Sequence, residues 1–193
     1  MSSTRIAIFA SGNGSNALNL IRFFTGHNSV QVAFVLSNNA NAPILEKAKN
    51  SGVRTIHRTN EEAANGTILL ELCKEEKIDW VILAGYLRLI PPSFLAAYNN
   101  KIINLHPSLL PKYGGKGMYG RKVHMAVLQN AEPESGITMH FVNEEYDKGR
   151  IIAQFHCQIV ENDTIESLEN KIRELEHLYF PVVVRNTILT QKS

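Results

Sequence analysis

Cysteine and tryptophan are scarce in this sequence. Its 193 residues include 2 cysteines, Cys73 and Cys157, and 1 tryptophan, Trp80. A chain of this length can bury roughly 70% of the surface that it exposes when unfolded, so its folding needs neither disulfides nor structural metals. We therefore expect both cysteines to be buried free thiols, although two cysteines also allow one disulfide. Trp80 precedes a strongly apolar run, and we expect it to pack in the core rather than to stack on a ligand.

Long hydrophobic runs are also missing. The chain begins MSSTRIAIFA, and its first apolar run has only five residues before Ser11. This run is too short for the core of a signal peptide, and no run approaches the roughly 20 residues that cross a bilayer. We therefore expect a soluble, cytoplasmic protein with no membrane partner.

An excess of charge of either sign is absent as well. Twenty Lys and Arg face eighteen Asp and Glu, so the formal net charge is +2. Dedicated nucleic-acid binders carry a clearer basic excess, so we expect no nucleic-acid partner. The sequence has no H-E-x-x-H motif and no paired cysteine motif, and we expect no metal. Neither its length nor its charge decides between a monomer and a homodimer.

Apolar runs alternate with helical patterns throughout the chain. The strand patterns are Ile6–Phe9, Val32–Leu36, Trp80–Ala84, Lys101–Leu105, Ile137–Val142 and Ile151–Ile159. The helical patterns are Ser15–Thr25, Pro43–Asn50, Asn60–Lys77, Met118–Gln129 and a last one from about Thr164, with Asp163 as its expected N-cap. This alternation predicts an α/β fold with a doubly wound, mostly parallel sheet, to which the last two strands add an antiparallel edge. No linker divides the chain, so we expect a single domain over 1–193.

A glycine-rich turn follows the first strand pattern, with the sequence Ser-Gly-Asn-Gly-Ser-Asn-Ala at 11–17. Glycines let the backbone approach a ligand closely, and the N–H groups that open the next helix attract an anion. The spacing of Gly12, Gly14 and Ala17 also fits the G-x-G-x-x-G/A turn of NAD(P)-binding proteins, which need an acidic or basic residue near the end of the second strand. That strand ends Leu-Ser-Asn-Asn-Ala and has neither. We therefore favour a monophosphate site over a dinucleotide site, with a turn that binds nothing as the remaining alternative.

Polar side chains follow two of the later strand patterns. Asn104 and His106 are two residues apart, so they point the same way from an extended segment, and Pro107 prevents a helix there. An imidazole exchanges protons near neutral pH, and an amide donates to a developing oxyanion. Asp147, in the connection before Ile151, is placed to orient His106 and to favour its protonated form. On spacing alone, a structural histidine is the more frequent outcome.

Four segments carry a resemblance to a known family. They are IFASGNGSN at 8–16, LAGYLRLI at 83–90, INLHPSLLPKY at 103–113 and the stretch 136–149. In this order, through nearly the whole chain, they resemble the folate-dependent formyltransferases. The N-x-H-P-S-L-L-P run is typical of that superfamily, and the SGNGSN turn resembles its phosphoribosylglycinamide formyltransferase members.

The resemblance implies a Rossmann-like formyltransferase fold, with a phosphate-binding half at about 1–100 and a folate-binding and catalytic half at about 101–193. It implies transfer of the formyl group of 10-formyltetrahydrofolate, a co-substrate, to the amine of 5-phosphoribosylglycinamide in de novo purine (IMP) biosynthesis. The substrate-binding positions that it implies are Gly14, Ser15, Asn16 and Glu176. The folate-binding positions that it implies are Leu87, Arg88, Leu89, Ile90 and Asn104.

The resemblance also assigns catalysis to Asn104, His106 and Asp147. Attack of the amine on the formyl carbon gives a tetrahedral intermediate, and the Asn104 amide donates to its oxyanion. His106 is the implied proton donor, and Asp147 orients and charges it.

Two features depart from the family pattern. The loop 114–121 is longer than the common form, and the family's folate-side arginine has no counterpart, because Glu62 falls near its expected place. The basic residues of the loop region either attract phosphate or the folate's glutamate tail, or form a solvated surface. They are Lys112, Lys116, Arg121 and Lys122.

Three other functions stay open, the last of which is a phosphate-binding module without catalysis. The first is a hydrolase or transferase of the same superfamily that uses water or a formylated tRNA acceptor, but such relatives usually carry a further domain, for which 193 residues and a net charge of +2 leave little room. The second is a nicotinamide-binding oxidoreductase or sensor that uses the turn at 12–17. His140 is also open to two interpretations, as a residue that lines the site or as a satisfied core histidine.

Overall fold

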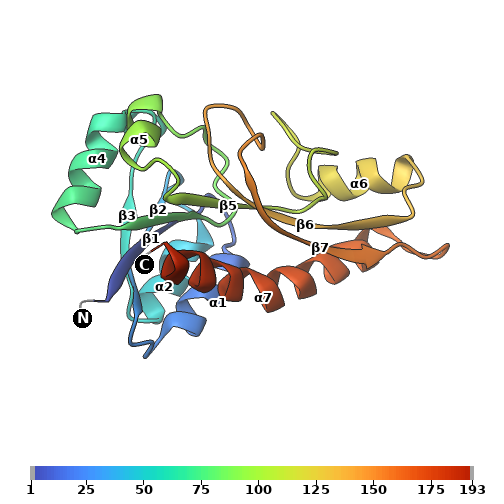
Figure 1. Cartoon of the computed structure of the whole chain (residues 1–193), viewed down its shortest axis with the longest axis horizontal. Helices are drawn as coiled ribbons and strands as arrows, with labels where there is room; N and C mark the ends of the chain where they lie inside the picture. The colour runs from blue at the N-terminus through green and yellow to red at the C-terminus, as the bar shows by residue number, and fades with distance from the viewer. Residues whose placement is uncertain (1–2, 192–193) are drawn as a thin grey trace.

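Seven strands form one sheet in the computed structural model, which describes residues 3–191 (Figure 1). They are β1 (Thr4–Phe9), β2 (Val30–Ser37), β3 (Arg54–His57), β4 (Trp80–Leu83), β5 (Ile102–His106), β6 (Glu134–Phe141) and β7 (Ile151–Gln158). Their order across the sheet is β3-β2-β1-β4-β5-β6-β7. The strands β1 to β5 pair in parallel, whereas β6 pairs antiparallel with both β5 and β7. The predicted doubly wound sheet with an antiparallel edge is confirmed.

The helices cover both faces of this sheet. They are α1 (Ser15–Phe24), α2 (Pro43–Asn50), α3 (Asn60–Ala63), α4 (Gly66–Glu75), α5 (Pro92–Ala97), α6 (Arg121–Gln129) and α7 (Ile165–Thr190). In Figure 1, α1, α2 and α7 lie on one side of the central strands, and α4 and α5 lie on the other. After β3 the order of the strands changes direction, and β4 pairs in parallel with the free side of β1. The carboxyl ends of β1, β4 and β5 therefore meet at one edge of the sheet.

The sequence predicts one helix over Asn60–Lys77, and the structure has two. The side chain of Asn65 accepts hydrogen bonds from the backbone N–H groups of Thr67 and Ile68 and so begins α4 anew. This cap satisfies donors that a continuous helix would have bonded internally. Two short elements, β3 and α5, are absent from the sequence prediction, since 4 and 6 residues are too few to establish a period.

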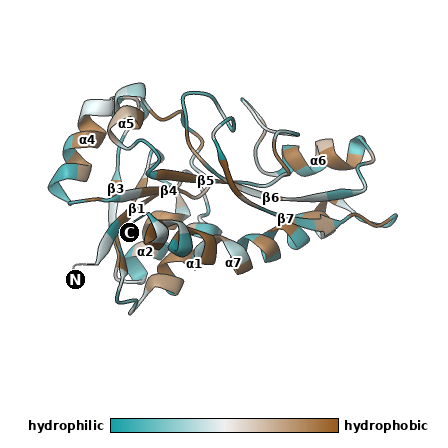
Figure 2. Ribbon diagram, viewed as in Figure 1, coloured by the Kyte–Doolittle hydropathy of each residue, from teal (hydrophilic) through white to brown (hydrophobic). Residues whose placement is uncertain are grey.

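Alternate residues of the central strands belong to two hydrophobic cores, one on each face of the sheet. On β1, Ile6 and Ile8 pack with α1 and α7, whereas Ala7 and Phe9 pack with α4 and α5. Figure 2 shows the hydrophobic residues concentrated along the central strands β4 and β5. Trp80 is buried in the first core, as predicted. Strands covered on both faces hold the sheet edge rigid, and the polar residues at their ends are thereby fixed in place.

Both cysteines are free thiols, as predicted. Cys73 is buried in the second core, and burial raises its pKa to about 12. Cys157, on the edge strand β7, is only partly buried, so the predicted burial of this second thiol is wrong.

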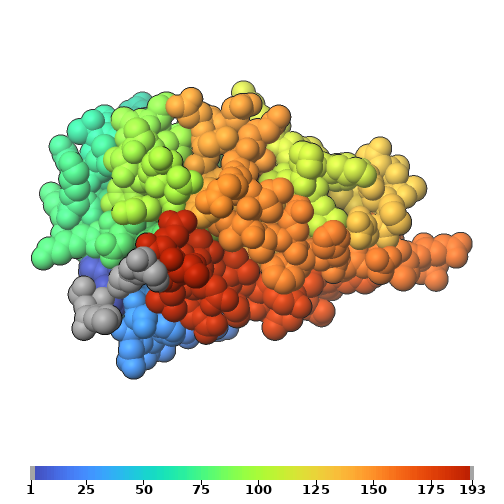
Figure 3. Space-filling view, viewed as in Figure 1, coloured from blue at the N-terminus to red at the C-terminus, as the bar shows by residue number. Residues whose placement is uncertain are grey.

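The long helix α7 contacts elements from both halves of the chain. Figure 3 shows its surface lying beside that of β7, and it also packs against α1 and α6. The expected N-cap, Asp163, is wrong by one residue: Thr164 accepts from the Ser167 backbone N–H, and the Ser167 hydroxyl accepts from the Thr164 N–H. Asp163 instead accepts from the Ser167 hydroxyl and from the Val160 N–H. Across residues 3–191, no helix combines the length and the apolar character that a membrane span requires.

The cap of α7 gives a stability prediction. Replacing Thr164→Ala removes the side-chain acceptor of the first turn and should lower the free energy of unfolding by about 1 kcal/mol, measured by urea denaturation. Thr164→Ser keeps the hydroxyl and is the matched control. Equal losses in the two variants would contradict the assignment of the cap.

Candidate active site

A cavity of about 700 Å³ opens at the carboxyl ends of β4 and β5. Every site residue that the sequence predicts lines it, apart from Gly14. These residues are Ser15, Asn16, Leu87, Arg88, Leu89, Ile90, Asn104, His106, Asp147 and Glu176. The two halves of the chain therefore contribute to one site, at the edge where parallel α/β sheets bind their ligands.

Gly14 shapes the first turn from just outside the cavity. It is the N-cap of α1 with φ 70°, and an added Cβ would lie 2.5 Å from the side chain of Ile44. Among the described residues no side chain caps α1, so the N–H groups of its first turn have no side-chain acceptor, and Ser15 and Asn16 of that turn line the cavity. Lys47 adds a positive charge nearby through its contact with Asn13. This arrangement suits an anion such as a phosphate.

The end of β2 does not offer what a dinucleotide requires. Asn38, which follows the strand, accepts a hydrogen bond of 2.6 Å from the Ser11 hydroxyl and donates one of 2.9 Å to the Asn60 side chain. The position where a dinucleotide-binding protein places an acidic or basic residue is thus filled by amides that already have partners.

Asn16 and Glu176 meet across the cavity wall. The Asn16 amide donates to a Glu176 carboxylate oxygen at 2.8 Å, which joins α1 to α7. Burial raises the pKa of Glu176, while the Asn16 hydrogen bond and the charge of Arg173 oppose this rise. Among the described residues, the Asn16 amide oxygen is buried without a hydrogen-bond partner. The carboxylate and the amide oxygen together provide acceptors for a ligand that donates hydrogen bonds, such as an amine.

Asn104 is held by the antiparallel neighbour of its strand. His140, opposite it on β6, uses Nδ1 to donate to the Phe141 carbonyl at 2.9 Å, so its Nε2 accepts from the Asn104 amide at 3.0 Å. The Asn104 amide also donates to Asp147 at 3.4 Å. His140 therefore both lines the cavity and has partners for its two ring nitrogens, which joins the two interpretations that the sequence left open.

Asp147 is the point where three segments meet. One carboxylate oxygen accepts the Asn104 amide, and the other accepts the Gly115 N–H at 2.9 Å and lies 3.4 Å from His106 Nδ1. Burial alone would raise the pKa of Asp147, but the His140 and His106 rings in their protonated forms and the Gly115 N–H lower it by more. The residue adopts φ 58°, a conformation that a side chain rarely takes outside a constrained site.

His106 lies in the cavity wall with only 4% of its surface exposed. Its Nδ1 faces Asp147, and its Nε2 donates to the Tyr113 backbone carbonyl at 2.8 Å. Burial lowers the pKa of His106, although Asp147 and the Tyr113 carbonyl partly offset the effect. In the structure, burial thus opposes the protonated form of His106 that the sequence predicts. Both ring nitrogens face acceptors rather than open space.

The predicted folate-binding segment forms one side of the opening. Leu87 and Leu89 are 49% and 44% exposed there, whereas Ile90 is buried in the second core. The Leu87 N–H donates to the Ser11 hydroxyl at 2.9 Å, which ties this segment to the first turn. Exposed leucines beside a cavity favour an apolar ligand.

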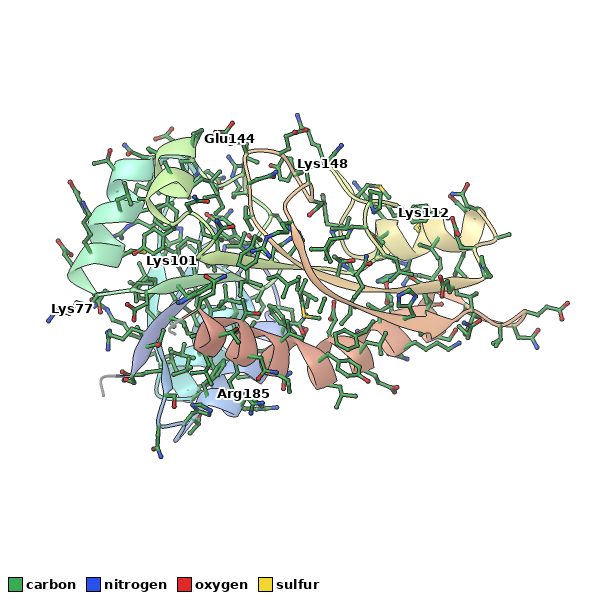
Figure 4. The ribbon with its side chains drawn as sticks, viewed as in Figure 1. Lys77, Lys101, Lys112, Glu144, Lys148 and Arg185 are labelled. Carbon is green, nitrogen blue, oxygen red and sulfur yellow. The ribbon has the colours of Figure 1, made fainter. Side chains whose placement is uncertain are left out.

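Two of the four basic residues of the loop region pair with carboxylates. Lys112 pairs with Glu132 at 3.0 Å, and Arg121 pairs with Glu166 and Glu169 on α7. Figure 4 shows Lys112 near α6, whereas Glu144 and Lys148 lie on the loop that carries Asp147. Lys116 lines the cavity. Glu62, near the expected place of the missing arginine, takes part in the capping box of α3.

Several contributions to this site were not predicted from the sequence, and three of them are polar groups close to the proposed chemistry. His124 on α6 and Arg173 on α7 line the cavity, and the Tyr113 carbonyl contacts His106. His124 is 5% exposed, and its Nδ1 has no partner among the described residues. The helical period predicts that these helices pack, but it does not show which polar residue faces a cavity that a distant loop completes.

A sequence profile described as formyl transferase matches residues 4–184. The chain belongs to the formyl transferase family. A Bacillus subtilis (strain 168) phosphoribosylglycinamide formyltransferase is 34% identical over 189 residues, which are 95% of this formyl transferase and 94% of that protein. The crystal structure of phosphoribosylglycinamide formyltransferase from Bacillus halodurans matches with a TM-score of 0.87 and 33% identity, covering 98% of this chain and 97% of that chain.

An Arabidopsis thaliana protein named phosphoribosylglycinamide formyltransferase, chloroplastic, is 39% identical over 186 residues. The match covers 93% of this formyl transferase and 64% of the Arabidopsis protein, so the chain spans less than two thirds of that relative. Within residues 3–191, no group of three or more His, Cys, Asp and Glu side chains is arranged to hold a metal ion.

The buried His124 of this formyl transferase gives a pH prediction. Burial lowers its pKa below 6.5 in the folded protein, and the charge of Glu169 opposes this only in part. The unfolded chain therefore takes up a proton first, and stability falls as the pH drops below about 6.5 towards the folded pKa. His124→Gln should lose less stability than the wild type between about pH 7.5 and pH 5.5 in urea denaturation. The exposed His57→Gln is the control, and equal losses in His124→Gln and the wild type would contradict the prediction.

Proposed function

We propose that this formyl transferase moves the formyl group of 10-formyltetrahydrofolate to the amine of 5-phosphoribosylglycinamide, a step of purine biosynthesis. The observation that carries the proposal is the single cavity into which the first turn, the Leu87–Ile90 segment and the Asn104–His106–Asp147 cluster all open. Relatives that bear the phosphoribosylglycinamide formyltransferase name, in Bacillus subtilis and Arabidopsis thaliana, support it.

The first turn and α7 are the proposed site of the glycinamide substrate. The uncapped N–H groups that follow Gly14 provide donors for its phosphate, with Ser15 and Asn16 at the cavity edge. The Glu176 carboxylate and the Asn16 amide oxygen provide acceptors for its amine. A neutral amine is the attacking form, so an acceptor that orients its N–H bonds also directs its lone pair.

The 87–90 segment is the proposed site of the formyl-folate. The exposed Leu87 and Leu89 supply apolar contact for the ring system of the folate. Arg88 lines the cavity next to them and is placed to attract an anionic group. These features fit the co-substrate that the family uses.

The Asn104–His106–Asp147 cluster is the proposed catalytic group. The amine forms a C–N bond to the formyl carbon, the bond from that carbon to the folate nitrogen breaks, and one proton passes from the amine to the folate nitrogen. The 3.4 Å hydrogen bond from Asn104 to Asp147 is long, so a developing oxyanion can compete for that amide hydrogen. His106 carries the proton once one of its ring nitrogens exchanges its acceptor in the substrate-free protein for the reacting groups, and Asp147 holds its ring in orientation.

The direct test of the proposed function is a formyl-transfer assay with purified protein, run with and without phosphoribosylglycinamide. Consumption of 10-formyltetrahydrofolate only when the amine is present is the expected result. Consumption without the amine would instead assign a formyl-folate hydrolase of the same superfamily. Absence of both reactions, together with NAD(P)H binding detected by fluorescence, would overturn the proposal in favour of an oxidoreductase or sensor.

Loss of the imidazole should remove most of the activity. His106→Ala is expected to lower kcat for formyl transfer by about 10²- to 10⁴-fold, because proton transfer then depends on water alone. His156→Ala is the matched control, since His156 lies half-exposed on β7 and pairs with Glu134 away from the cavity. Undiminished turnover in His106→Ala would show that the proton takes another route.

Loss of the Glu176 charge should weaken binding of the amine substrate. Glu176→Gln keeps an oxygen for the Asn16 amide but removes the negative charge, and the KM for phosphoribosylglycinamide should rise by roughly tenfold or more. The KM for formyl-folate should change little. Glu174→Gln, an exposed neighbour on α7, is the control, and an unchanged amine KM in Glu176→Gln would contradict the role.

A further inference from the structure

The Tyr113 backbone carbonyl is the closest acceptor of the His106 ring. It lies 2.8 Å from Nε2, compared with 3.4 Å between Nδ1 and the Asp147 carboxylate. A carbonyl oxygen accepts but never donates, so this contact requires a proton on Nε2. Where the Tyr113 peptide sits therefore decides which nitrogen of a neutral His106 carries the proton.

The position of that peptide depends on a residue outside the active-site cavity. Glu132, in the turn between α6 and β6, accepts from the Tyr113 hydroxyl at 2.8 Å and from Lys112 Nζ at 3.0 Å. Its side chain is 18% exposed and lines a separate cavity of about 260 Å³ together with Lys112 and Tyr113. Glu132 is thus bonded to two successive residues, the second of which carries the carbonyl that contacts His106.

The same segment is held on its other side by the active site. Gly115 donates its N–H to Asp147 at 2.9 Å, and an added Cβ on Gly114 would lie 3.2 Å from the Asp147 Cβ. Tyr113 itself has φ 55°, a conformation that a side chain adopts only when its surroundings fix it. The segment 112–115 is therefore held by Glu132 and Asp147, together with Ser108, whose hydroxyl donates to the Lys112 carbonyl at 2.7 Å. Loss of Glu132 removes the contact that fixes the Tyr113 side chain and loosens the strained residue that carries the carbonyl.

We propose that Glu132 is a positioning residue for His106, acting through the Tyr113 hydroxyl to hold the Tyr113 carbonyl against Nε2. This inference rests on the proposed function, in which His106 carries the transferred proton. A proton kept on Nε2 leaves Nδ1 to face Asp147, so the ring is poised to be charged between two acceptors when substrates enter. Without the anchor, Asp147 becomes the sole fixed acceptor and draws the proton of neutral His106 to Nδ1.

The test is the tautomer of His106, measured from the ring ¹⁵N chemical shifts of the substrate-free protein, alongside kcat for formyl transfer. Tyr113→Phe removes one oxygen and leaves the backbone in place, and Glu132→Ala removes the acceptor. Both variants should shift the neutral His106 from the Nε2–H to the Nδ1–H form and lower kcat by about three- to tenfold with little change in KM. The double variant should show no additional shift, since both changes break one chain of contacts.

Two controls separate positioning from general destabilisation. Glu132→Gln keeps an oxygen for the Tyr113 hydroxyl and should retain the Nε2–H form. Glu134→Gln changes a carboxylate that pairs with His156 instead, and it should leave both the tautomer and kcat unchanged. An unchanged tautomer in Tyr113→Phe and Glu132→Ala would overturn the inference, as would an equal shift in Glu134→Gln. The tautomer is read without substrate, so its outcome does not depend on whether the formyl-transfer assay succeeds.

Discussion

The Asp147 carboxylate holds the active site together. It accepts from the Asn104 amide on β5 and from the Gly115 N–H on the following loop, and it faces His106 Nδ1 from the connection between β6 and β7. These three segments approach one another because β5 lies between the parallel part of the sheet and its antiparallel edge. Asp147 stays ionised although it is partly buried, because several donors contact its carboxylate. The site depends on this balance between burial and hydrogen bonding.

Opposing effects also act on the pKa of His106. Burial lowers its pKa, whereas the two acceptors at its ring nitrogens favour the charged form. A histidine held between opposing effects changes its charge when a ligand alters either one, which is the property that proton transfer at neutral pH requires. The proposed roles of Glu132 and of the Tyr113 carbonyl follow from the same constraint, because the acceptor at Nε2 is as much a part of the balance as the carboxylate at Nδ1.

The sequence predicts the sheet and the strand-end residues well, and the reasons are physical. Strands covered on both faces leave continuous apolar runs, and the two-residue spacing of Asn104 and His106 places them on one side of β5. Asp147 lies 41 residues beyond His106 in the sequence, so its position before Ile151 pairs it with His106 only weakly, and the family resemblance strengthens the pairing. The contact between His106 and the Tyr113 carbonyl could not be predicted, since a backbone carbonyl is present in every residue type. The break at Asn65 and the cap at Thr164 depend on local hydrogen bonds that compete with equally suitable neighbours.

The central claim is that the charge of Asp147 organises catalysis, and the most direct measurement is kcat for formyl transfer by Asp147→Asn over a range of pH. Asparagine has the same shape but cannot accept with a full charge from Gly115, Asn104 and His106 together. We predict a folded variant whose kcat is lower by about a hundredfold or more and is not restored at any pH. A variant with a rate near that of the wild type would contradict it.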